Sequence, residues 1–207
     1  MESIFTSLLA PYQEYSALNV LLEFTAVFFG LLSVWFSKKN NILVYPTGII
    51  STLIFVYLLF NWGLLGDMLI NAYYFSMSVY GWYYWTRKKG SIDLNPISRM
   101  NQFEFRMAQA LFIFALLFVF LIYSVFDKWN SIIAYVDTFT TAIFFVGMWL
   151  MARRKIEHWL FWIVGDLISI PLYYVKGYSL TGIQYLIFFI IAIAGFYTWK
   201  KELYEHG

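Results

Sequence analysis

The stretch LNVLLEFTAVFFGLLSVWFS at residues 18–37 contains a single charged residue, Glu23. A helix rises about 1.5 Å per residue, so about 20 consecutive apolar residues cross the hydrocarbon core of a bilayer. The stretch shows no alternation of period two, which favours a helix over a barrel strand. It therefore predicts a membrane-spanning helix with one acidic side chain inside it.

The rest of the chain repeats this pattern. Hydrophobic residues make up 61% of the 207 residues and charged residues 13%, whereas soluble domains average about half apolar and about a quarter charged. The absence of cysteine excludes disulfides and thiolate metal sites. We therefore predict an all-α membrane protein with seven transmembrane helices. Six apolar runs follow the first, at residues 41–60, 64–86, 107–126, 130–152, 157–175 and 179–200.

The sequence also aligns with itself at a shift of 114 residues without a gap. The span at 107–126 has no counterpart in this alignment. Spans 1–3 and 5–7 are therefore predicted to be copies of one three-helix unit. The matches lie at both ends of the unit: Glu23 with Asp137, Trp35 with Trp149, Lys39 with Arg153, Gly63 with Gly177, and GWYYW at 81–85 with GFYTW at 195–199.

One extra helix between the copies gives both the same orientation in the membrane, a 3+1+3 plan of two parallel repeats and a linker helix. Parallel repeats are a transporter architecture whose substrate binds between the repeats near the midplane. A duplication kept only for packing is the alternative. The predicted segments are an interfacial N-terminal segment at 1–17, repeat 1 at 18–86, a cytoplasmic loop at 87–106, the linker helix at 107–129, repeat 2 at 130–200 and a cytoplasmic tail at 201–207.

The basic residues orient these spans. Of the 14 lysines and arginines, 12 fall in the connections after spans 1, 3, 5 and 7. The positive-inside rule then places the N-terminus outside and the C-terminus in the cytoplasm. The basic segment 86–106 is explained by the same rule, so no nucleic-acid partner is predicted.

Acidic residues lie within the spans, and no lysine or arginine lies deep in any of them. Buried carboxylates without basic partners are either protonated or bind a cation, and an ionisable group inside a membrane is a functional candidate. We predict a cation path whose entrance includes Glu23 and Asp137. The alternative for these two is a structural role, with hydrogen bonds from hydroxyls such as Thr25 and Thr138. The four acids are Glu23, Asp67 and Asp137 near the outer face and Asp166 near the centre.

The span at 157–175 brings aromatic rings to the central acid. Trp159, Trp162 and Asp166 are spaced three and four residues apart, which places them on one helix face. Stacked indoles beside a carboxylate suit a flat cationic heteroaromatic ring, whereas a bare metal ion needs several oxygen ligands. Polar side chains on neighbouring spans can bind hydroxyls or an amide. The predicted substrate contacts are Trp159, Trp162, Asp166, Asn71, Asp67, Tyr74 and Gln184; Ser78, Thr181 and Tyr185 lie beside them.

Other tryptophans and tyrosines have a plainer interpretation. Trp82, Tyr83, Trp85 and Trp199 lie near span ends, where an aromatic belt at the bilayer interface is common. We predict that these four belong to such a belt rather than to a site.

At YGWYYWTR (80–87) and RRKIEHWLFWIVGDLISI (153–170) the chain resembles the Pnu family of bacterial vitamin transporters, most closely its nicotinamide riboside (PnuC) group. The resemblance implies vitamin uptake by facilitated diffusion across the inner membrane, trapping by a cytoplasmic kinase, and a homotrimer. Ligand contacts of the family include the WxxW pair, here Trp159 and Trp162. Asp166 and Asn71 depart from the asparagine and glutamine expected of nicotinamide riboside carriers. Thiamine, which is also cationic, is therefore the alternative substrate, and neutral riboflavin fits worst.

Rival functions find less support in the residues. An enzyme would need a nucleophile or an acid–base pair facing a cavity, and His158 and His206 are the only histidines. No phosphate-binding glycine loop is present, so ATP hydrolysis and a cofactor are not predicted. A sugar carrier would suit the tryptophans but not the acids, and a receptor would need a soluble domain. Pro46, Gly48 and Pro171 mark expected bends for alternating access.

Overall fold

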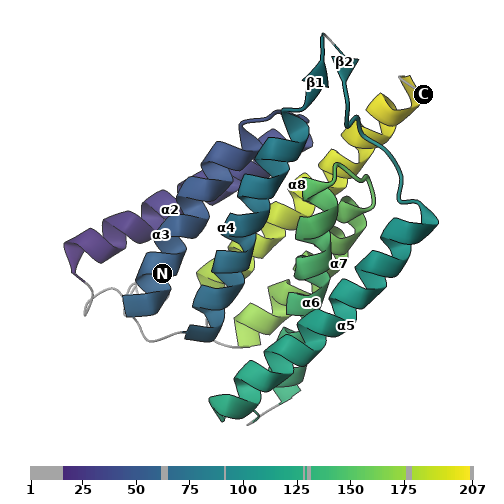
Figure 1. Cartoon of the computed structure of the whole chain (residues 1–207). Helices are drawn as coiled ribbons and strands as arrows, with labels where there is room; N and C mark the ends of the chain where they lie inside the picture. The colour runs from purple at the N-terminus through teal and green to yellow at the C-terminus, as the bar shows by residue number, and fades with distance from the viewer. Residues whose placement is uncertain are drawn as a thin grey trace.

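The computed structural model describes residues 16–61, 65–90, 92–127, 129, 132–175 and 179–205, so most of the predicted interfacial segment at 1–17 lies outside the described residues. The described residues form seven long helices and one short hairpin (Figure 1). The helices are α2 (Ala17–Lys38), α3 (Val44–Asn61), α4 (Leu65–Trp85), α5 (Gln102–Val125), α6 (Ile132–Ala152), α7 (His158–Val175) and α8 (Ser179–Glu205).

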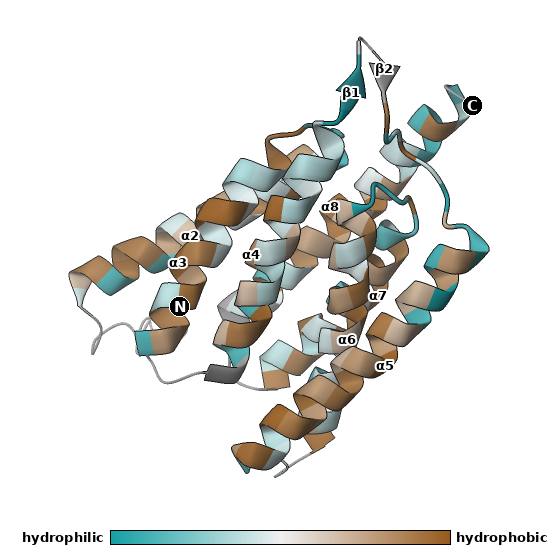
Figure 2. Ribbon diagram, in the orientation of Figure 1, coloured by the Kyte–Doolittle hydropathy of each residue, from teal (hydrophilic) through white to brown (hydrophobic). Residues whose placement is uncertain are grey.

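The predicted all-α membrane fold with seven spans is confirmed. Six of the helices are long and apolar enough to cross a membrane, and brown apolar residues cover most of their length in Figure 2. The seventh helix, α4, carries polar side chains such as Asp67 and Asn71, which lower its hydropathy. The boundaries drawn between the predicted segments stay predictions.

Two helix ends differ from the sequence prediction by five residues. Helix α5 begins at Gln102, five residues before the predicted span, because Asn101 and Glu104 form a capping box. Each side chain accepts a hydrogen bond from the backbone N–H of the other, at 2.8 and 3.0 Å. Helix α8 continues to Glu205, into the predicted tail. The predicted loop between α4 and α5 contains the hairpin, in which β1 (Lys88–Lys89) pairs antiparallel with β2 (Ile92–Asp93).

The six helices of the repeats form a closed ring. Helix α3 packs between α2 and α4, and α7 packs in the same way between α6 and α8. The halves join where α4 meets α6 and where α8 meets α2, which are equivalent contacts under the 114-residue shift. Helix α5 packs on the outside of α6 (Figure 1). Two parallel three-helix repeats joined by a linker helix are therefore confirmed.

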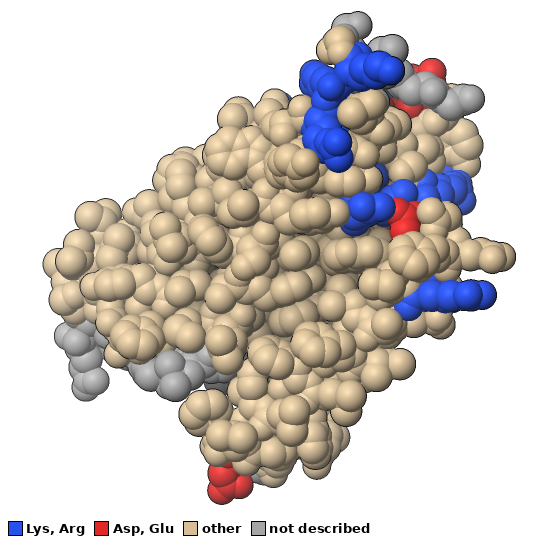
Figure 3. All heavy atoms as spheres, in the orientation of Figure 1, with Lys and Arg blue, Asp and Glu red and all other residues tan. Residues whose placement is uncertain are grey.

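Basic side chains gather at the end of the ring where α2, α4, α6 and α8 finish, here called the basic end. Figure 3 shows the blue atoms concentrated there, with a broad uncharged surface below. Lys38, Arg87, Arg153 and Lys200 all lie at this end.

The two repeats match each other most closely in the turns at the basic end. Asn40 and Arg154 occupy equivalent positions and both have positive φ, 49° and 59°. The N–H groups of these two residues bond the carbonyls of Ser37 and Met151, both at 2.9 Å. Arg154 Nε also donates to Asn40 Oδ1 at 3.0 Å. Because equivalent residues touch each other, the pseudo-twofold axis passes between them.

Two tryptophans fasten the repeats together around this axis. Trp85 Nε1 of α4 donates to the Met151 carbonyl of α6 at 3.3 Å. Trp199 Nε1 of α8 donates to the Ser37 carbonyl of α2 at 2.8 Å. Donors and acceptors are related pairwise by the 114-residue shift, so each repeat gives the other the same hydrogen bond.

Glycines let aromatic rings approach these helices. A Cβ at Gly81 would lie 2.3 Å from the Tyr45 ring, and a Cβ at the equivalent Gly195 would lie 2.5 Å from the Trp159 ring. Both rings are buried, and each packs edge-on against a tryptophan of its own repeat, at centroid distances of 5.1 and 5.8 Å. The glycines are therefore required by close packing.

We expect Gly81→Ala to destabilise the protein by about 2 kcal/mol, since the buried Tyr45 ring has nowhere to move. The melting temperature in detergent, followed by tryptophan fluorescence, should fall by about 4–8 °C. Gly182→Ala is the matched control, because its Cβ would meet its nearest atom at an ordinary 3.4 Å and alanine favours the helix. An equal loss of stability in both variants would contradict the packing argument.

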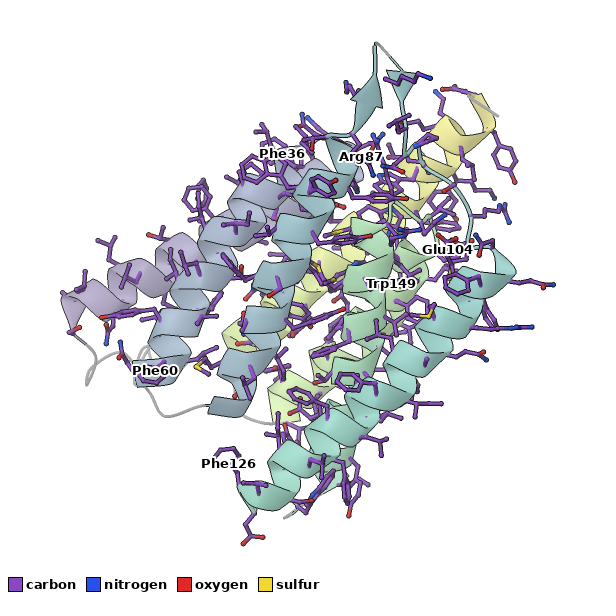
Figure 4. All side chains as sticks on the ribbon, viewed as in Figure 1. Phe36, Phe60, Arg87, Glu104, Phe126 and Trp149 are labelled. Carbon is purple, nitrogen blue, oxygen red and sulfur yellow. The ribbon has the colours of Figure 1, made fainter. Side chains whose placement is uncertain are left out.

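A buried carboxylate attaches the linker helix to repeat 2. Glu104, in the first turn of α5, lies 3.1 Å from Arg153 Nη2 and 2.9 Å from Lys155 Nζ. Figure 4 shows Glu104 at this end of α5, toward the bundle. Backbone hydrogen bonds between Ser98 and both Arg154 and Ile156 continue the attachment. The sequence analysis gave this carboxylate no role.

Candidate substrate site

Asp166 lies in the middle of α7 and is buried. Its side chain is 1% exposed, and Oδ1 is buried with no hydrogen-bond partner among the described residues. Ser169, one turn further along α7, is also 1% exposed with an unpartnered Oγ. Since buried polar groups are nearly always hydrogen-bonded, these two atoms on one helix face can form hydrogen bonds with a bound molecule.

A stack of aromatic rings from three helices forms a wall beside Asp166. Trp162 of α7 stacks on Phe144 of α6 at 5.3 Å between centroids and 29° between planes. Phe144 stacks on Tyr185 of α8 at 6.0 Å and 13°, and Tyr185 stacks on Tyr173 at 5.0 Å and 27°. Such offset-stacked rings offer flat π-faces to an aromatic ligand. The predicted role of Trp162 therefore fits its position.

Phe144 and Tyr173 are the members of the wall that the sequence analysis missed. Phe144 packs against the glycine before Asp166, where a Cβ at Gly165 would lie 2.3 Å from its ring. The signal was available, because Phe144 lies two helical turns after Asp137 on α6 and therefore on the same helix face.

The second tryptophan of the pair lies elsewhere. Trp159 is 1% exposed and packs edge-on against Trp199 at 5.8 Å, one turn nearer the basic end. Its ring covers Gly195, and His158 lies 4.3 Å away. The structure thus separates the pair, with Trp162 in the aromatic wall and Trp159 in the core at the basic end.

Some of the predicted polar contacts on α4 and α8 lie near Asp166, and others do not. Tyr74 of α4 and Tyr185 both interact electrostatically with Asp166. Asn71 instead donates to the Asp67 carbonyl of its own helix at 3.0 Å, and the Asp67 side chain is exposed. Gln184 is half-buried on α8 beside Tyr185. Tyr74 of α4 therefore lies near Asp166.

The two acids of the predicted entrance lie in different surroundings. Asp137 accepts a hydrogen bond from the Tyr123 phenol of the linker helix, whereas Glu23 is half-buried on α2. The hydroxyls of Thr25 and Thr138 donate to backbone carbonyls of their own helices at 2.7 and 2.8 Å. These hydroxyl protons are therefore not donated to the carboxylates.

The predicted aromatic belt is correct in exposure for Trp82 and Tyr83 and wrong for Trp85 and Trp199. Trp82 and Tyr83 are 43% and 62% exposed, as a belt requires. Trp85 and Trp199 are buried, because they cross between the repeats to bond backbone carbonyls. Burial at a repeat interface cannot be read from the position of these residues in the sequence.

Comparison with known proteins agrees with this fold. The sequence model of the family described as "Nicotinamide mononucleotide transporter" matches residues 20–201. The nicotinamide riboside transporter PnuC of Escherichia coli is 23% identical over 90% of this chain and 87% of its own length. The riboflavin/roseoflavin transporter RibM of Streptomyces davaonensis is 24% identical over 82% of this chain and 80% of its own.

A solved structure shows the same architecture. The crystal structure of the vitamin B3 transporter PnuC superposes with a TM-score of 0.65 and 22% identity, and the alignment covers 90% of this chain and 83% of that one. The family match covers most of the sequence, and the family members and the structural relative are transporters. This chain therefore belongs to the nicotinamide mononucleotide transporter family and is a multi-pass membrane transport protein, not an enzyme.

Proposed function

We propose that this transporter carries a small cationic aromatic vitamin, with nicotinamide riboside as the first candidate and thiamine as the alternative. The observation that carries the proposal is the Asp166 carboxyl, which is buried, has an unpartnered oxygen and lies one helical turn from the stacked Trp162. A carboxylate beside π-faces complements a ring that is both flat and positively charged.

The aromatic wall supports a stacked pose for the ring. Phe144 covers Trp162 in this structure, so the vitamin ring enters the stack by displacing Phe144 and faces Asp166. Tyr74 and Tyr185 then donate hydrogen bonds to the ligand's hydroxyls, and Gln184 supplies an amide. Trp159, Asn71 and Asp67 contact the ligand only after rearrangement, since their side chains point to other partners or to solvent here.

The two kinds of relative are named for different substrates. PnuC proteins are named for nicotinamide riboside and RibM for riboflavin and roseoflavin. The riboflavin ring system is neutral and gains no charge complement from a buried carboxylate, so Asp166 favours the cationic vitamins.

We further propose that transport follows alternating access and facilitated diffusion across the bacterial inner membrane. The N-terminus lies outside and the C-terminus inside, as the basic end indicates. Glu23 and Asp137 attract the cation at the outer end, and the bend residue Pro171 lies inside α7. The vitamin is trapped by a cytoplasmic kinase, and the assembly is a homotrimer.

Binding calorimetry in detergent tests the substrate. We expect nicotinamide riboside or thiamine to bind with micromolar affinity and riboflavin to bind far more weakly. Asp166→Asn should weaken the cationic vitamin by more than about tenfold, because a charge-assisted contact is lost. Asp127→Asn makes the same chemical change at an exposed residue of positive φ and should leave affinity unchanged. Absence of binding by either cationic vitamin would contradict the proposal.

A further inference from the structure

An open cavity lies beside the first turns of α5, at the basic end. Its volume is about 490 Å³, which is within the range of sites for small ligands. Its lining comes from α5, from the residues just before α5 and from the turn between α6 and α7. The cavity is therefore separate from the candidate substrate site. Its lining includes Met100, Gln102, Phe105, Arg106, Gln109 and Glu157.

Two opposite charges line this cavity without pairing with each other. Arg106 is exposed, and its guanidinium forms no hydrogen bond or ion pair with the residues that the structure describes. Glu157 is half-buried and held at one oxygen, since Oε2 accepts a hydrogen bond from the Met100 N–H at 3.1 Å. A bound molecule that carries both an anionic and a cationic group would bridge these two side chains.

Neutral hydrogen-bond donors flank Arg106 on α5. Gln102 precedes it by four residues and Gln109 follows it by three, so the three side chains lie on one helix face. Both glutamines line the cavity. The fork of N–H donors in a guanidinium matches the oxygens of a phosphate, and amide N–H groups add further donors. This side of the cavity therefore suits a phosphate group.

The same face of α5 becomes apolar further along the helix. Ile113, Leu117 and Phe120 continue it at helical spacing and are exposed, and they are here called the apolar stripe. Figure 2 shows the change from hydrophilic colour in the first turns of α5 to brown along most of the rest. The 24 residues of α5 extend about 36 Å, longer than a hydrocarbon core of about 30 Å, so its first turns reach the headgroup layer.

We propose that the cavity binds the headgroup of a phospholipid that carries both a phosphate and an ammonium group, as phosphatidylethanolamine does. Arg106, Gln102 and Gln109 bind the phosphate, Glu157 binds the ammonium, and the acyl chains lie along the apolar stripe. A purely anionic lipid such as phosphatidylglycerol offers no cation to Glu157 and is repelled by it. The proposal is independent of which vitamin the protein carries.

The bound lipid would connect the linker helix to repeat 2. Arg106 belongs to α5, whereas Glu157 belongs to the turn between α6 and α7. The lipid thus adds a second bridge beside the ion pairs of Glu104 with Arg153 and Lys155. A ligand that binds only the folded protein raises its stability, so this lipid should stabilise the protein against heat.

Native mass spectrometry of the delipidated protein in detergent tests the binding directly. Phosphatidylethanolamine and phosphatidylglycerol with the same acyl chains are added separately at equal concentrations. We expect the first phosphatidylethanolamine to bind about fivefold more tightly, because it satisfies one more partly exposed charge. It should also raise the melting temperature more than phosphatidylglycerol does.

Four variants assign the contacts. Arg106→Gln should weaken both lipids by about fivefold, the size of one partly exposed ion pair. Arg87→Gln makes the same change at an exposed residue of the basic end outside the cavity and should leave both unchanged. Glu157→Gln keeps an oxygen for the Met100 N–H, so it should weaken only phosphatidylethanolamine and abolish the preference. Glu205→Gln, on the exposed end of α8, should preserve the preference.

The outcomes decide the proposal. Equal affinity for the two lipids, or tighter binding of phosphatidylglycerol, overturns the ammonium contact and the proposal with it. Equal lipid binding by Arg106→Gln and Arg87→Gln overturns the assignment of the phosphate to this cavity. Because Arg106 is exposed, the melting temperature of its variant without lipid should stay within about 3 °C of the unsubstituted protein. If that variant failed to fold, a preference that persists in Glu157→Gln would still overturn the proposal.

Discussion

Glu104→Gln is expected to lower the free energy of unfolding by about 3 kcal/mol, the lower part of the range for breaking a buried ion pair. The Glu104 side chain is 3% exposed, with Arg153 and Lys155 at 3.1 and 2.9 Å. Glutamine preserves the shape and the capping hydrogen bond but removes the charge that both cations share. We expect a loss in the lower part of that range because the Arg153 side chain is partly exposed to solvent, which weakens its attraction to Glu104.

The measurement is the melting temperature in detergent, which should fall by about 6–12 °C. Glu205→Gln is the matched control, because Glu205 pairs with Lys201 at 3.6 Å on the exposed end of α8, and such pairs contribute little. If the two variants had the same melting temperature, Glu104 would have no special role in attaching α5 to repeat 2.

Trp199→Ala should cost about 3–5 kcal/mol, the range for removing a large buried aromatic side chain. The ring is fully buried, packs against Trp85, Trp159 and His158, and donates a hydrogen bond across the repeat interface to the Ser37 carbonyl. The variant therefore loses packing on both repeats and the hydrogen bond that joins α8 to α2, while the Ser37 carbonyl keeps the N–H of Asn40 as a donor.

Trp82→Ala supplies the comparison, since Trp82 is the same residue type on α4, the helix of repeat 1 that is equivalent to α8, but is 43% exposed. Its melting temperature should change by less than about 3 °C. Trp199→Phe should fall between the two, because phenylalanine keeps one aromatic ring but loses the fused five-membered ring and its N–H. A loss for Trp82→Ala as large as for Trp199→Ala would contradict the assignment of Trp199 to the core.

Much of the fold could be predicted because bilayers constrain sequences strongly. A spanning helix must satisfy its own backbone and must be about 20 residues long, so apolar runs gave all seven helices to within a few residues. The early start of α5 was missed because a capping box lies outside the apolar run, although Asn101 and Glu104 carry the pattern. The polar stripe of α4 also explains why hydropathy alone ranks that span lowest.

The candidate site was less predictable. Helical spacing placed Trp159, Trp162 and Asp166 on one face, but spacing cannot say which neighbouring helix each side chain meets. Trp162 meets Phe144 of α6, whereas Trp159 meets Gly195 and Trp199 of α8. The difference arises because a glycine on α8 lets the helix approach Trp159 and close over it.

The sequence by itself thus determined the seven-helix membrane fold, its internal duplication and the presence of a lone acid in the middle of α7, because these follow from hydropathy, periodicity and residue type. Only the tertiary structure decided how the duplicated units meet. It placed Trp85 and Trp199 in reciprocal hydrogen bonds between the repeats, gave Asp137 the Tyr123 phenol as a partner, and left Asp166 Oδ1 without a hydrogen-bond partner among the residues that the structure describes. These outcomes depend on contacts between residues far apart in the chain, which no local pattern encodes.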